Sequence, residues 1–418
     1  MQNPHPSGRR EFLKGAAATG AAVAIANTAV PTSTASAEEK FPPVKLGIIG
    51  CGMMGTRHIT RLLGMKQYCQ ITAVCDVYTK WLDEQADRTG AQRFKDYRKM
   101  LDSGAVDAVL VATPDHWHGK MCIDAANAGK DIYVEKPMTH WQDLQEARDV
   151  VEAVRRNDRV MQVGVQSMSD ARYEQALKMV QQGRLGKVMR AQTSYMRAGD
   201  HPKYNPNARE SEAVPGETLD WDMWLGPAPK IPFDAGRFAA FRSFFDYSGG
   251  GVTDSLPHRL APLAAALGVG FPKRVASTGG KYLFTDRREI PDVVNISVEY
   301  PGGPSIYLMT GMGSAYNLPT QIDGSNGQMR FEGHGFEIQD RDGNTVEKVT
   351  STRAPEDPAQ RVEHAKNFFH SIHTREKPRC DEWFGYQVMT VLHMAMHSYL
   401  DGKMYEFDEE TETVSAVG

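Results

Sequence analysis

The sequence of 418 residues predicts two domains: an N-terminal Rossmann domain on a parallel sheet, then an α+β domain with a mostly antiparallel, open sheet covered by helices on one face. Between residues 44 and 166, short apolar runs without polar alternation are separated by helical stretches, which is typical of a parallel sheet covered on both faces. Later segments alternate apolar and polar residues, as antiparallel strands do. We therefore expect a dinucleotide-binding domain over residues 38–165 and a substrate-binding and oligomerisation domain over residues 166–418.

Residues 1–37 have the features of a twin-arginine signal peptide. Arg9 and Arg10 precede a Glu-Phe-Leu-Lys run, and the apolar segment over 15–30 is too short and too mild to span a membrane. An Ala-Ser-Ala sequence at 35–37 fits a cleavage site. We expect export, for example to the periplasm, and no membrane insertion after cleavage. The alternative interpretation is a disordered, alanine-rich tail.

The Rossmann domain should alternate strands and helices in chain order, because each parallel strand needs a crossover connection to the next. Strands are expected over 45–49, 71–75, 108–113, 132–135 and 160–166, and helices over 56–63, 78–88, 97–101, 120–128 and 141–155.

The second domain should begin with a helix and a strand, then continue through a long loop rich in Pro, Asn and Gly over 198–233. A run of three glycines at 249–251 opens a helix that should extend to about residue 267. The other expected elements are a helix over 171–181, strands over 188–196, 275–279, 293–300, 305–311, 327–332 and 335–340, a turn at 341–344 and a helical tail over 360–401.

A glycine-rich turn between the first strand and the first helix predicts a dinucleotide site. Gly50 permits the tight turn, Gly52 lets the backbone approach a pyrophosphate, and Gly55 lets the helix pack close to the strand. Met53 and Met54 lie within the same turn, and we expect them to contact the cofactor.

Asp76 ends the second strand, 21 residues after Gly55. A carboxylate at that position can accept both hydroxyls of a ribose and would repel a 2′-phosphate. The sequence therefore favours NAD over NADP as the cofactor.

Composition excludes several other classes of function. The formal net charge is −4 and basic residues are interspersed with acidic ones, so no nucleic-acid surface is predicted. The five cysteines are scattered without a Cys-x-x-Cys pair, and the histidines are not at ligand spacing with carboxylates, so we predict no metal site.

Four further motifs resemble those of the Gfo/Idh/MocA family, which includes glucose–fructose oxidoreductase and inositol dehydrogenases. Thr113-Pro-Asp-His-Trp-His118 follows the third predicted strand, and Glu135-Lys136-Pro137 ends the next one. In the second domain, Trp221–Pro227 and the triple glycine followed by Asp254-x-x-x-His258 are similar to family motifs. The resemblance covers essentially the whole chain after the signal.

The resemblance implies three catalytic residues. Lys136 would lie beside the nicotinamide and the reacting hydroxyl, where an ammonium lowers the pKa of an alcohol. His258 would take the hydroxyl proton, and Asp254 would either orient that pair or bind a neighbouring hydroxyl. The spacing of these two residues is i, i+4, so we expect both on one side of a single helix.

The resemblance also implies contacts that the sequence by itself supports less directly. Residues expected around the nicotinamide half of the cofactor are Thr113, Pro114, His118, Glu135, Lys136 and Gln166. Residues expected to bind substrate are His116, Trp117, Tyr195, Arg197 and Trp221. For the aromatic ones, packing in the core or at a subunit contact is the alternative, and His58 in the first helix is equally compatible with a structural role.

The leading interpretation is an NAD-dependent oxidoreductase that acts on a hydroxyl of a sugar, glycoside or cyclitol and forms homo-oligomers through the second domain's sheet. Because the twin-arginine route exports folded proteins, the cofactor would be loaded first, held tightly and recycled in place. One alternative is a redox-neutral, NAD-dependent glycoside hydrolase or lyase that uses transient oxidation. A second alternative is an inactive exported sugar-binding protein.

Overall fold

The computed structural model describes residues 41–207, 212–350 and 357–417 of the chain. The predicted signal peptide lies outside these residues. The two predicted domains are described together, because residues from Phe41 onward form one compact unit.

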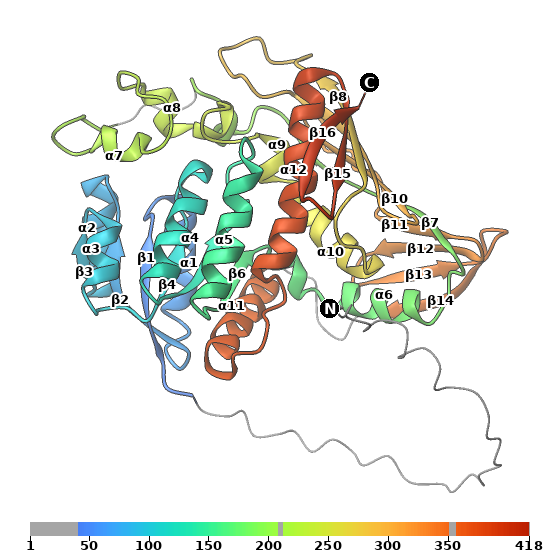
Figure 1. Ribbon diagram of the computed structural model, residues 1–418, viewed down its shortest axis with the longest axis horizontal. Coiled ribbons are helices and arrows are strands. Elements are labelled where there is room, and N and C mark those ends of the chain that lie inside the picture. Colours follow the sequence, from blue (N-terminus) through green and yellow to red (C-terminus); the bar gives the residue numbers. More distant parts are fainter. Residues whose placement is uncertain (1–40, 208–211, 351–356, 418) are drawn as a thin grey trace, which may run out of the picture. The chain divides into compact units, whose positions relative to one another are not determined.

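The first domain contains a six-stranded parallel sheet in the order β3-β2-β1-β4-β5-β6 (Figure 1). The side chains of β4 and β5 are buried throughout, which explains why these strands read as continuous apolar runs. The order reverses between β1 and β4, which is the position where open α/β sheets bind ligands. The strands are β1 (Val44–Ile49), β2 (Cys69–Cys75), β3 (Gln92–Phe94), β4 (Ala108–Val111), β5 (Asp131–Glu135) and β6 (Met161–Gly164).

The helices of this domain follow the predicted order with shifted ends. Helix α1 begins three residues earlier than expected, inside the glycine-rich turn, and α5 begins three residues later. Asp143 explains the later start, because its side chain accepts a hydrogen bond from the backbone of Gln145 and caps α5. The helices are α1 (Met53–Leu62), α2 (Thr79–Thr89), α3 (Tyr97–Asp102), α4 (His118–Asn127) and α5 (Leu144–Arg156), with 3₁₀ turns η1 (Asp115–Trp117) and η2 (Gln166–Ser169).

The second domain contains a ten-stranded sheet in the order β14-β13-β12-β11-β7-β10-β9-β8-β15-β16. Strands β7 and β10 pair in parallel, and the neighbouring pairs around them are antiparallel. The sequence pattern missed β3, β11, β14, β15 and β16, which are short or carry few buried side chains. The strands are β7 (Val188–Arg197), β8 (Arg274–Gly280), β9 (Val293–Glu299), β10 (Ser305–Met312), β11 (Gln321–Gly324), β12 (Gly327–Glu332), β13 (Gly335–Gln339), β14 (Thr345–Thr350), β15 (Met404–Asp408) and β16 (Thr413–Val417).

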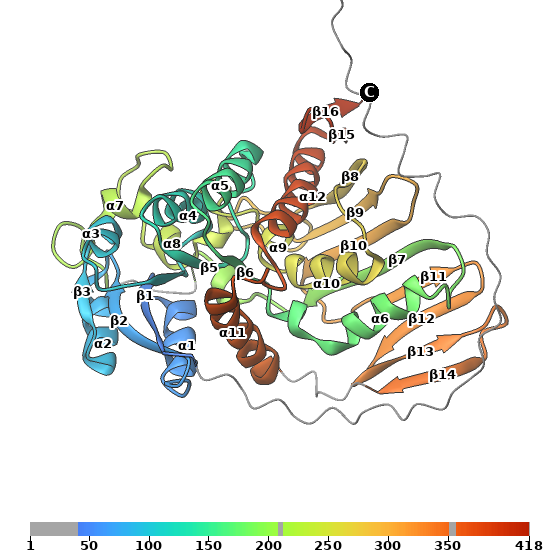
Figure 2. The same ribbon diagram turned by 60° about the horizontal axis from the view of Figure 1, so that its bottom comes forward.

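Helices α6 (Ala171–Gln181), α10 (Pro257–Leu267) and α12 (Glu382–Asp401) pack against one face of this sheet (Figure 2). Ile306 and Leu308 of β10 are buried in one apolar core with Leu260 and Leu263 of α10. Tyr307, which points to the opposite face, is 46 % exposed. The alternation along β10 therefore separates a helix-covered face from an open one.

Two expected helices are each divided in the structure. The helix after the triple glycine is two helices, α9 (Gly251–Asp254) and α10, because the helical assignment is interrupted at Ser255 and Leu256, before Pro257, which has no N–H to donate and begins α10. The expected helical tail is confirmed as α11 (Asp357–Thr374) followed by α12, with Arg375 at a φ of 60° between them. Among the described residues, no helix has the length and hydropathy needed to cross a membrane.

The chain returns to the first domain after completing most of the second. Phe368 and Phe369 of α11 are buried in the same apolar core as Leu46 of β1 and Tyr133 of β5. Helix α12 then packs between α5 and β8 (Figure 1). The core of the Rossmann domain thus includes residues from far beyond the predicted boundary at 165.

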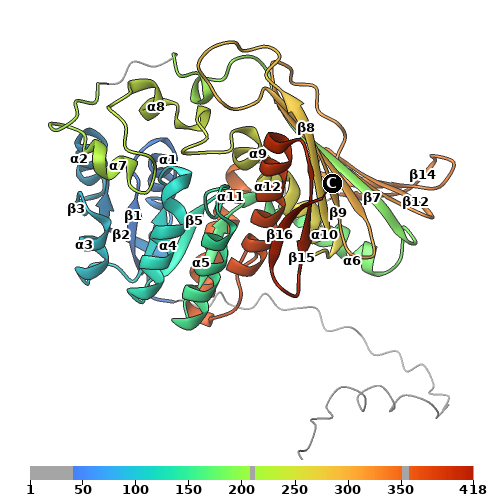
Figure 3. The same ribbon diagram turned by 45° about the horizontal axis from the view of Figure 1, so that its top comes forward.

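The described residues 198–207 and 212–248 form short elements, of which α7 and α8 lie over the carboxyl end of the parallel sheet (Figure 3). These elements are η3 (Pro202–Tyr204), α7 (Trp221–Leu225), α8 (Ala235–Ala239) and η4 (Phe241–Ser243).

Replacing Phe368 with Ala should lower the free energy of unfolding by about 3–5 kcal/mol, the usual cost of truncating a buried Phe. Chemical denaturation followed by fluorescence measures this. Tyr307→Ala is the control, because that side chain is half exposed. Equal, small effects of the two substitutions would mean that α11 does not belong to the Rossmann core.

Candidate functional site

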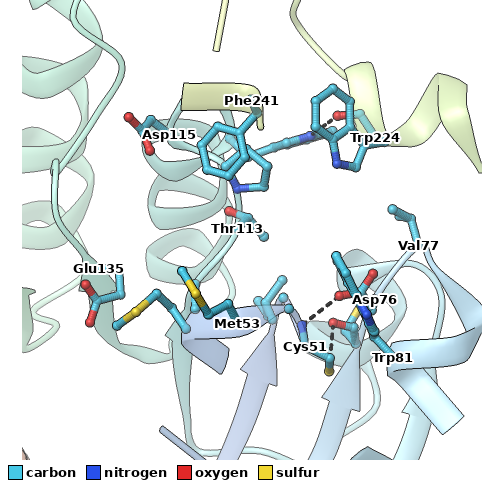
Figure 4. Close-up of a pocket in the computed structure, with 18 of the residues that line it drawn as sticks. Cys51, Met53, Asp76, Val77, Trp81, Thr113, Asp115, Glu135, Trp224 and Phe241 are labelled. Atoms are coloured by element: carbon cyan, nitrogen blue, oxygen red, sulfur yellow. Dashed lines mark hydrogen bonds between the residues drawn. The ribbon is translucent and has the colours of Figure 1, made fainter. Parts of the chain in front are cut away.

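A cavity of about 510 Å³ lies between the carboxyl ends of β1, β2, β4 and β5 and the elements α7 to η4. Figure 4 shows Cys51 and Asp76 on one side of it and Trp224 and Phe241 across from them. Predicted site residues that line the cavity are Gly50, Gly52, Met53, Met54, Asp76, Thr113, Pro114, Trp117, His118, Glu135 and Lys136.

The glycine-rich turn is constrained by close backbone contacts. Gly50 has a φ of +92°, and a Cβ there would lie 2.7 Å from the carbonyl oxygen of Ala112. A Cβ on Gly55 would lie 1.9 Å from the carbonyl oxygen of Gly50. Both positions therefore require glycine, which explains why Gly50 and Gly55 occur at this spacing in the glycine-rich turn.

Asp76 is tied to the glycine-rich turn. Its Oδ2 accepts a hydrogen bond of 2.6 Å from the backbone N–H of Cys51, and its Oδ1 accepts one of 2.8 Å from Tyr78. Burial raises the pKa of Asp76 to about 6, although these backbone donors oppose the shift. Each carboxylate oxygen keeps a lone pair that can accept a ribose hydroxyl.

Glu135, the first residue of the Glu-Lys-Pro motif, is held in a buried network. Nε2 of His58 lies 2.6 Å from its Oε1, and the amide of Gln166 donates to the same oxygen over 2.9 Å. Burial alone would raise the pKa of Glu135, but His58 lowers it to about 2. The amide of Gln166 also donates to the hydroxyl of Tyr133, so Gln166 supports Glu135 from outside the cavity lining and does not line it as expected.

His118 connects the two motifs that line the nicotinamide side of the predicted site. Its Nδ1 lies 2.6 Å from the carbonyl oxygen of Pro137, and its Nε2 lies 3.0 Å from that of Thr113. The Thr113-Pro114 loop and the Glu-Lys-Pro loop are therefore held at a defined separation.

Three of the aromatic residues predicted to bind substrate make packing contacts with α7 or its neighbours. His116 and Trp117 both contact the carbonyl oxygen of Trp224, at 3.1 and 2.8 Å, and so attach α7 to η1. Trp221 stacks on Trp224 at 4.7 Å and donates its Nε1–H to Ile231. Of His116, Trp117 and Trp221, only Trp117 lines the cavity, and burial lowers the pKa of His116 to about 3.

Tyr195 and Arg197, also expected at the substrate, contact each other outside the cavity lining. The guanidinium of Arg197 lies 4.6 Å from the ring centroid of Tyr195, and that of Arg259 lies 5.2 Å from it. This is a cation–π cluster at the end of β7.

At the other end of the cavity, the buried carboxylate of Asp254 accepts hydrogen bonds from three basic side chains and one hydroxyl group. Its Oδ1 accepts from Lys136 Nζ at 2.8 Å and from Arg242 Nε at 3.0 Å, and its Oδ2 accepts from Lys203 and from the hydroxyl of Tyr204. Burial would raise the pKa of Asp254, but the three cations hold it well below its usual range.

Asp254 and His258 lie on two consecutive helices and not on the single helix expected. Asp254 ends α9 and His258 lies in the first turn of α10, and Ser255 and Leu256 between them have right-handed helical backbone angles. Among the described residues, no hydrogen bond joins their side chains, and neither lines the cavity. Burial and the nearby ammonium of Lys136 lower the pKa of His258 to about 3. Of the three predicted catalytic residues, only Lys136 reaches the cavity.

Lys203, Arg242 and Asp115 also line the cavity. The sequence singled out none of them as a catalytic or cofactor residue, and for Arg242 it left open carboxylate binding or a surface position. Asp115 is buried and accepts a hydrogen bond of 2.7 Å from Ser248, and burial raises its pKa. Lys203 and Arg242 come from irregular segments without a recognisable motif. A sequence signal was available only for Asp115, which lies inside the Thr-Pro-Asp-His-Trp-His motif.

Comparison with known families gives two matches that together span most of the chain. Residues 44–165 match the Gfo/Idh/MocA model described as an oxidoreductase family with an NAD-binding Rossmann fold. Residues 170–416 match the model described as the oxidoreductase family's C-terminal alpha/beta domain.

Curated relatives match the chain over part of its length. An inositol 2-dehydrogenase of Salmonella paratyphi B is 26% identical over 185 residues, which are 44% of this chain and 54% of that protein. An alpha-N-acetylgalactosaminidase of Shewanella oneidensis is 26% identical over 226 residues, 47% of either chain. The chain thus spans about half the length of the curated relatives it matches.

Solved structures share the fold at low identity. The WlbA dehydrogenase of Bordetella pertussis, in complex with NADH and UDP-GlcNAcA, has a TM-score of 0.67 at 20% identity and covers 88% of this chain and 99% of its own. The scyllo-inositol dehydrogenase of Lactobacillus casei, with NAD(H) and scyllo-inositol, has a TM-score of 0.65 at 19% identity, with coverages of 87% and 99%.

The residues present fit a bound NAD. The glycine cradle leaves backbone N–H groups free of side chains at the start of α1, where a pyrophosphate would bind. Asp76 would take the ribose hydroxyls, and the Thr113-Pro114 and Glu-Lys-Pro loops would enclose the nicotinamide end.

Replacing Asp76 with Ser and Val77 with Arg should narrow or reverse the preference for NAD, because the carboxylate that repels a 2′-phosphate is replaced by a cation. Isothermal titration with both cofactors measures the ratio of dissociation constants. Asp83→Ser, an exposed position on α2, is the control. Tighter binding of NADP by the unmodified protein would contradict the placement of Asp76.

Proposed function

The chain belongs to the Gfo/Idh/MocA oxidoreductase family, and on that premise we propose that it oxidises a hydroxyl group of a sugar, glycoside or cyclitol with a tightly held NAD. One observation carries this proposal. The ammonium of Lys136 is fixed by Asp254 in the same cavity as the glycine-rich turn and Asp76. A dinucleotide that binds along the turn would therefore bring its reactive end to Lys136.

Bound NAD would supply the oxidant, accepting a hydride from the carbon that carries the hydroxyl. Lys136 would donate a hydrogen bond to the hydroxyl oxygen and stabilise negative charge there as the proton leaves. Asp254 would hold that ammonium in place rather than contact the substrate, since its oxygens already accept four hydrogen bonds. Trp117, Trp224 and Phe241 would exclude water from the cavity.

A redox-neutral glycoside hydrolase or lyase is the second candidate. It is supported by the similarity to the alpha-N-acetylgalactosaminidase of Shewanella oneidensis, which extends over about as much of the chain as the similarity to inositol dehydrogenases. In that reaction the sugar would be oxidised, cleaved and reduced again within one cavity, and no net cofactor would be consumed.

Export through the twin-arginine route is part of the proposal. It is supported by the arginine pair, the mild apolar segment and the Ala-Ser-Ala sequence. Homo-oligomers would form through the open face of the ten-stranded sheet, where Tyr307 is partly exposed.

The function is tested on protein purified from the exported fraction. Native mass spectrometry should show NAD bound, and a panel of inositols, aldoses and aryl glycosides, including an α-N-acetylgalactosaminide, should contain a substrate that changes the cofactor's absorbance. Lys136→Met should retain NAD and lose about 10²–10⁴ in turnover, the usual contribution of a positioned acid–base group. The control is Lys120→Met, at an exposed position of α4.

Products distinguish the two candidates. A dehydrogenase gives an oxidised sugar and a reduced second substrate, whereas the redox-neutral enzyme gives a cleaved glycoside at unchanged oxidation level. Normal turnover of Lys136→Met would contradict both.

Replacing Arg9 and Arg10 together with Lys should trap the precursor in the cytoplasm, because the paired arginines are what the twin-arginine route recognises. Fractionation followed by immunoblotting measures the distribution. Lys14→Arg is the matched control. Normal export of the double variant would mean that the protein crosses unfolded and that its cofactor is not loaded beforehand.

A further inference from the structure

Lys203 is a second lysine at the reacting end of the cavity. It comes from η3, lines the cavity, and donates to Oδ2 of Asp254, while Lys136 donates to Oδ1. The two amines therefore reach the same space from different domains, separated by the width of one carboxylate group. The side chain of Lys203 is 13% exposed, so the nitrogen lies mostly out of bulk water.

The charges around Lys203 favour its neutral form. Asp254 is shared with two further cations, Lys136 and Arg242, and arginine keeps its proton in proteins. Asp115 offsets part of this positive charge beside Arg242 and Lys136, and the remainder is relieved most easily when a lysine loses a proton. Burial lowers the pKa of Lys203 to about 7; Asp254 opposes this shift, and Arg242, Lys136 and Arg197 add to it. Near neutral pH a large fraction of Lys203 is thus an amine that can accept a proton.

Oxidation of an alcohol requires only one acid–base group, whereas this cavity holds two adjacent ones. Removing the elements of hydrogen from an alcohol transfers one proton, and Lys136 is placed for that oxygen. A second amine beside it suits chemistry on the neighbouring carbon, whose C–H becomes acidic once the alcohol is a ketone.

We propose that Lys203 is a catalytic acid–base residue that removes a proton from the carbon next to the carbonyl of the oxidised substrate. The C–H bond breaks, its proton moves to the neutral Nζ, and its electron pair forms a carbon–carbon double bond while the carbonyl pair moves onto oxygen. Lys136 and Arg242 stabilise the resulting enolate. The reverse step returns the proton. This inference rests on the proposed function and selects its redox-neutral form.

The experiment uses ketones directly, so that it does not depend on alcohol oxidation. The purified holoprotein is incubated in D₂O buffer with inosose, the ketone of myo-inositol, and with a methyl glucoside oxidised to the ketone at its third carbon. Deuterium uptake beside the carbonyl is followed by NMR and corrected for uncatalysed exchange. Catalysed exchange should rise with pH through about 7, because the neutral amine is the active form.

Lys203→Met and Lys203→Arg should both lose about 10²–10⁴ in exchange rate, because neither presents an amine that can accept a proton. The arginine variant keeps the positive charge beside Asp254, so a loss of exchange in it is due to the missing amine and not to unfolding. Thermal denaturation checks that the variant remains folded. Lys120→Met is the surface control. The ammonium signal of Lys203, assigned by its absence in the arginine variant, should titrate near 7 by NMR of lysine-labelled protein.

Exchange in Lys203→Arg as fast as in the unmodified protein would overturn the proposal, and so would absence of catalysed exchange in the unmodified protein or titration of Lys203 near the usual lysine value. The proposed function is measured separately, by bound NAD and its reduction by alcohols, and its failure would appear there.

Discussion

The arrangement of the site depends on the buried carboxylate of Asp254. Lys136 reaches it from the end of β5, Lys203 and Tyr204 from η3, and Arg242 from η4. Removing one partner from a buried charge pair costs about 3–5 kcal/mol, so the carboxylate and its cations are mutually dependent. This cluster connects the Rossmann domain to the loop that covers it, and it fixes where the lysines enter the cavity.

At the opposite end of the cavity, the arrangement depends on the conformation and hydrogen bonds of the backbone, not on a cluster of charged side chains. Gly50 and Gly55 bring backbone atoms within distances that no side chain allows, and Asp76 is held by backbone N–H groups. Between the two ends, His118 fixes the spacing of the loops through two carbonyl oxygens. A dinucleotide would lie along an apolar, backbone-lined channel that leads to a compact ionic cluster.

Aromatic residues line one side of the cavity and also pack against one another. Trp224 receives hydrogen bonds on its carbonyl oxygen from η1 and stacks against Trp221, so α7 is attached both to the Rossmann domain and to its own core. Trp117 and Trp224 therefore both line the cavity and support the covering loop.

The parallel sheet, the glycine-rich turn and Asp76 could be predicted from sequence patterns, whereas Lys136 was identified through the resemblance to a family. These features arise from local rules, namely strand and helix periodicity, the steric demands of glycine and residues adjacent in the chain. Tertiary structure alone decided which charged groups face the cavity. Asp254 and His258 are four residues apart, yet the side chain of Asp254 pairs with Lys136, Lys203 and Arg242. Lys203, 67 residues from Lys136, shares its carboxylate because burial forces distant opposite charges together, and no short-range pattern records that constraint.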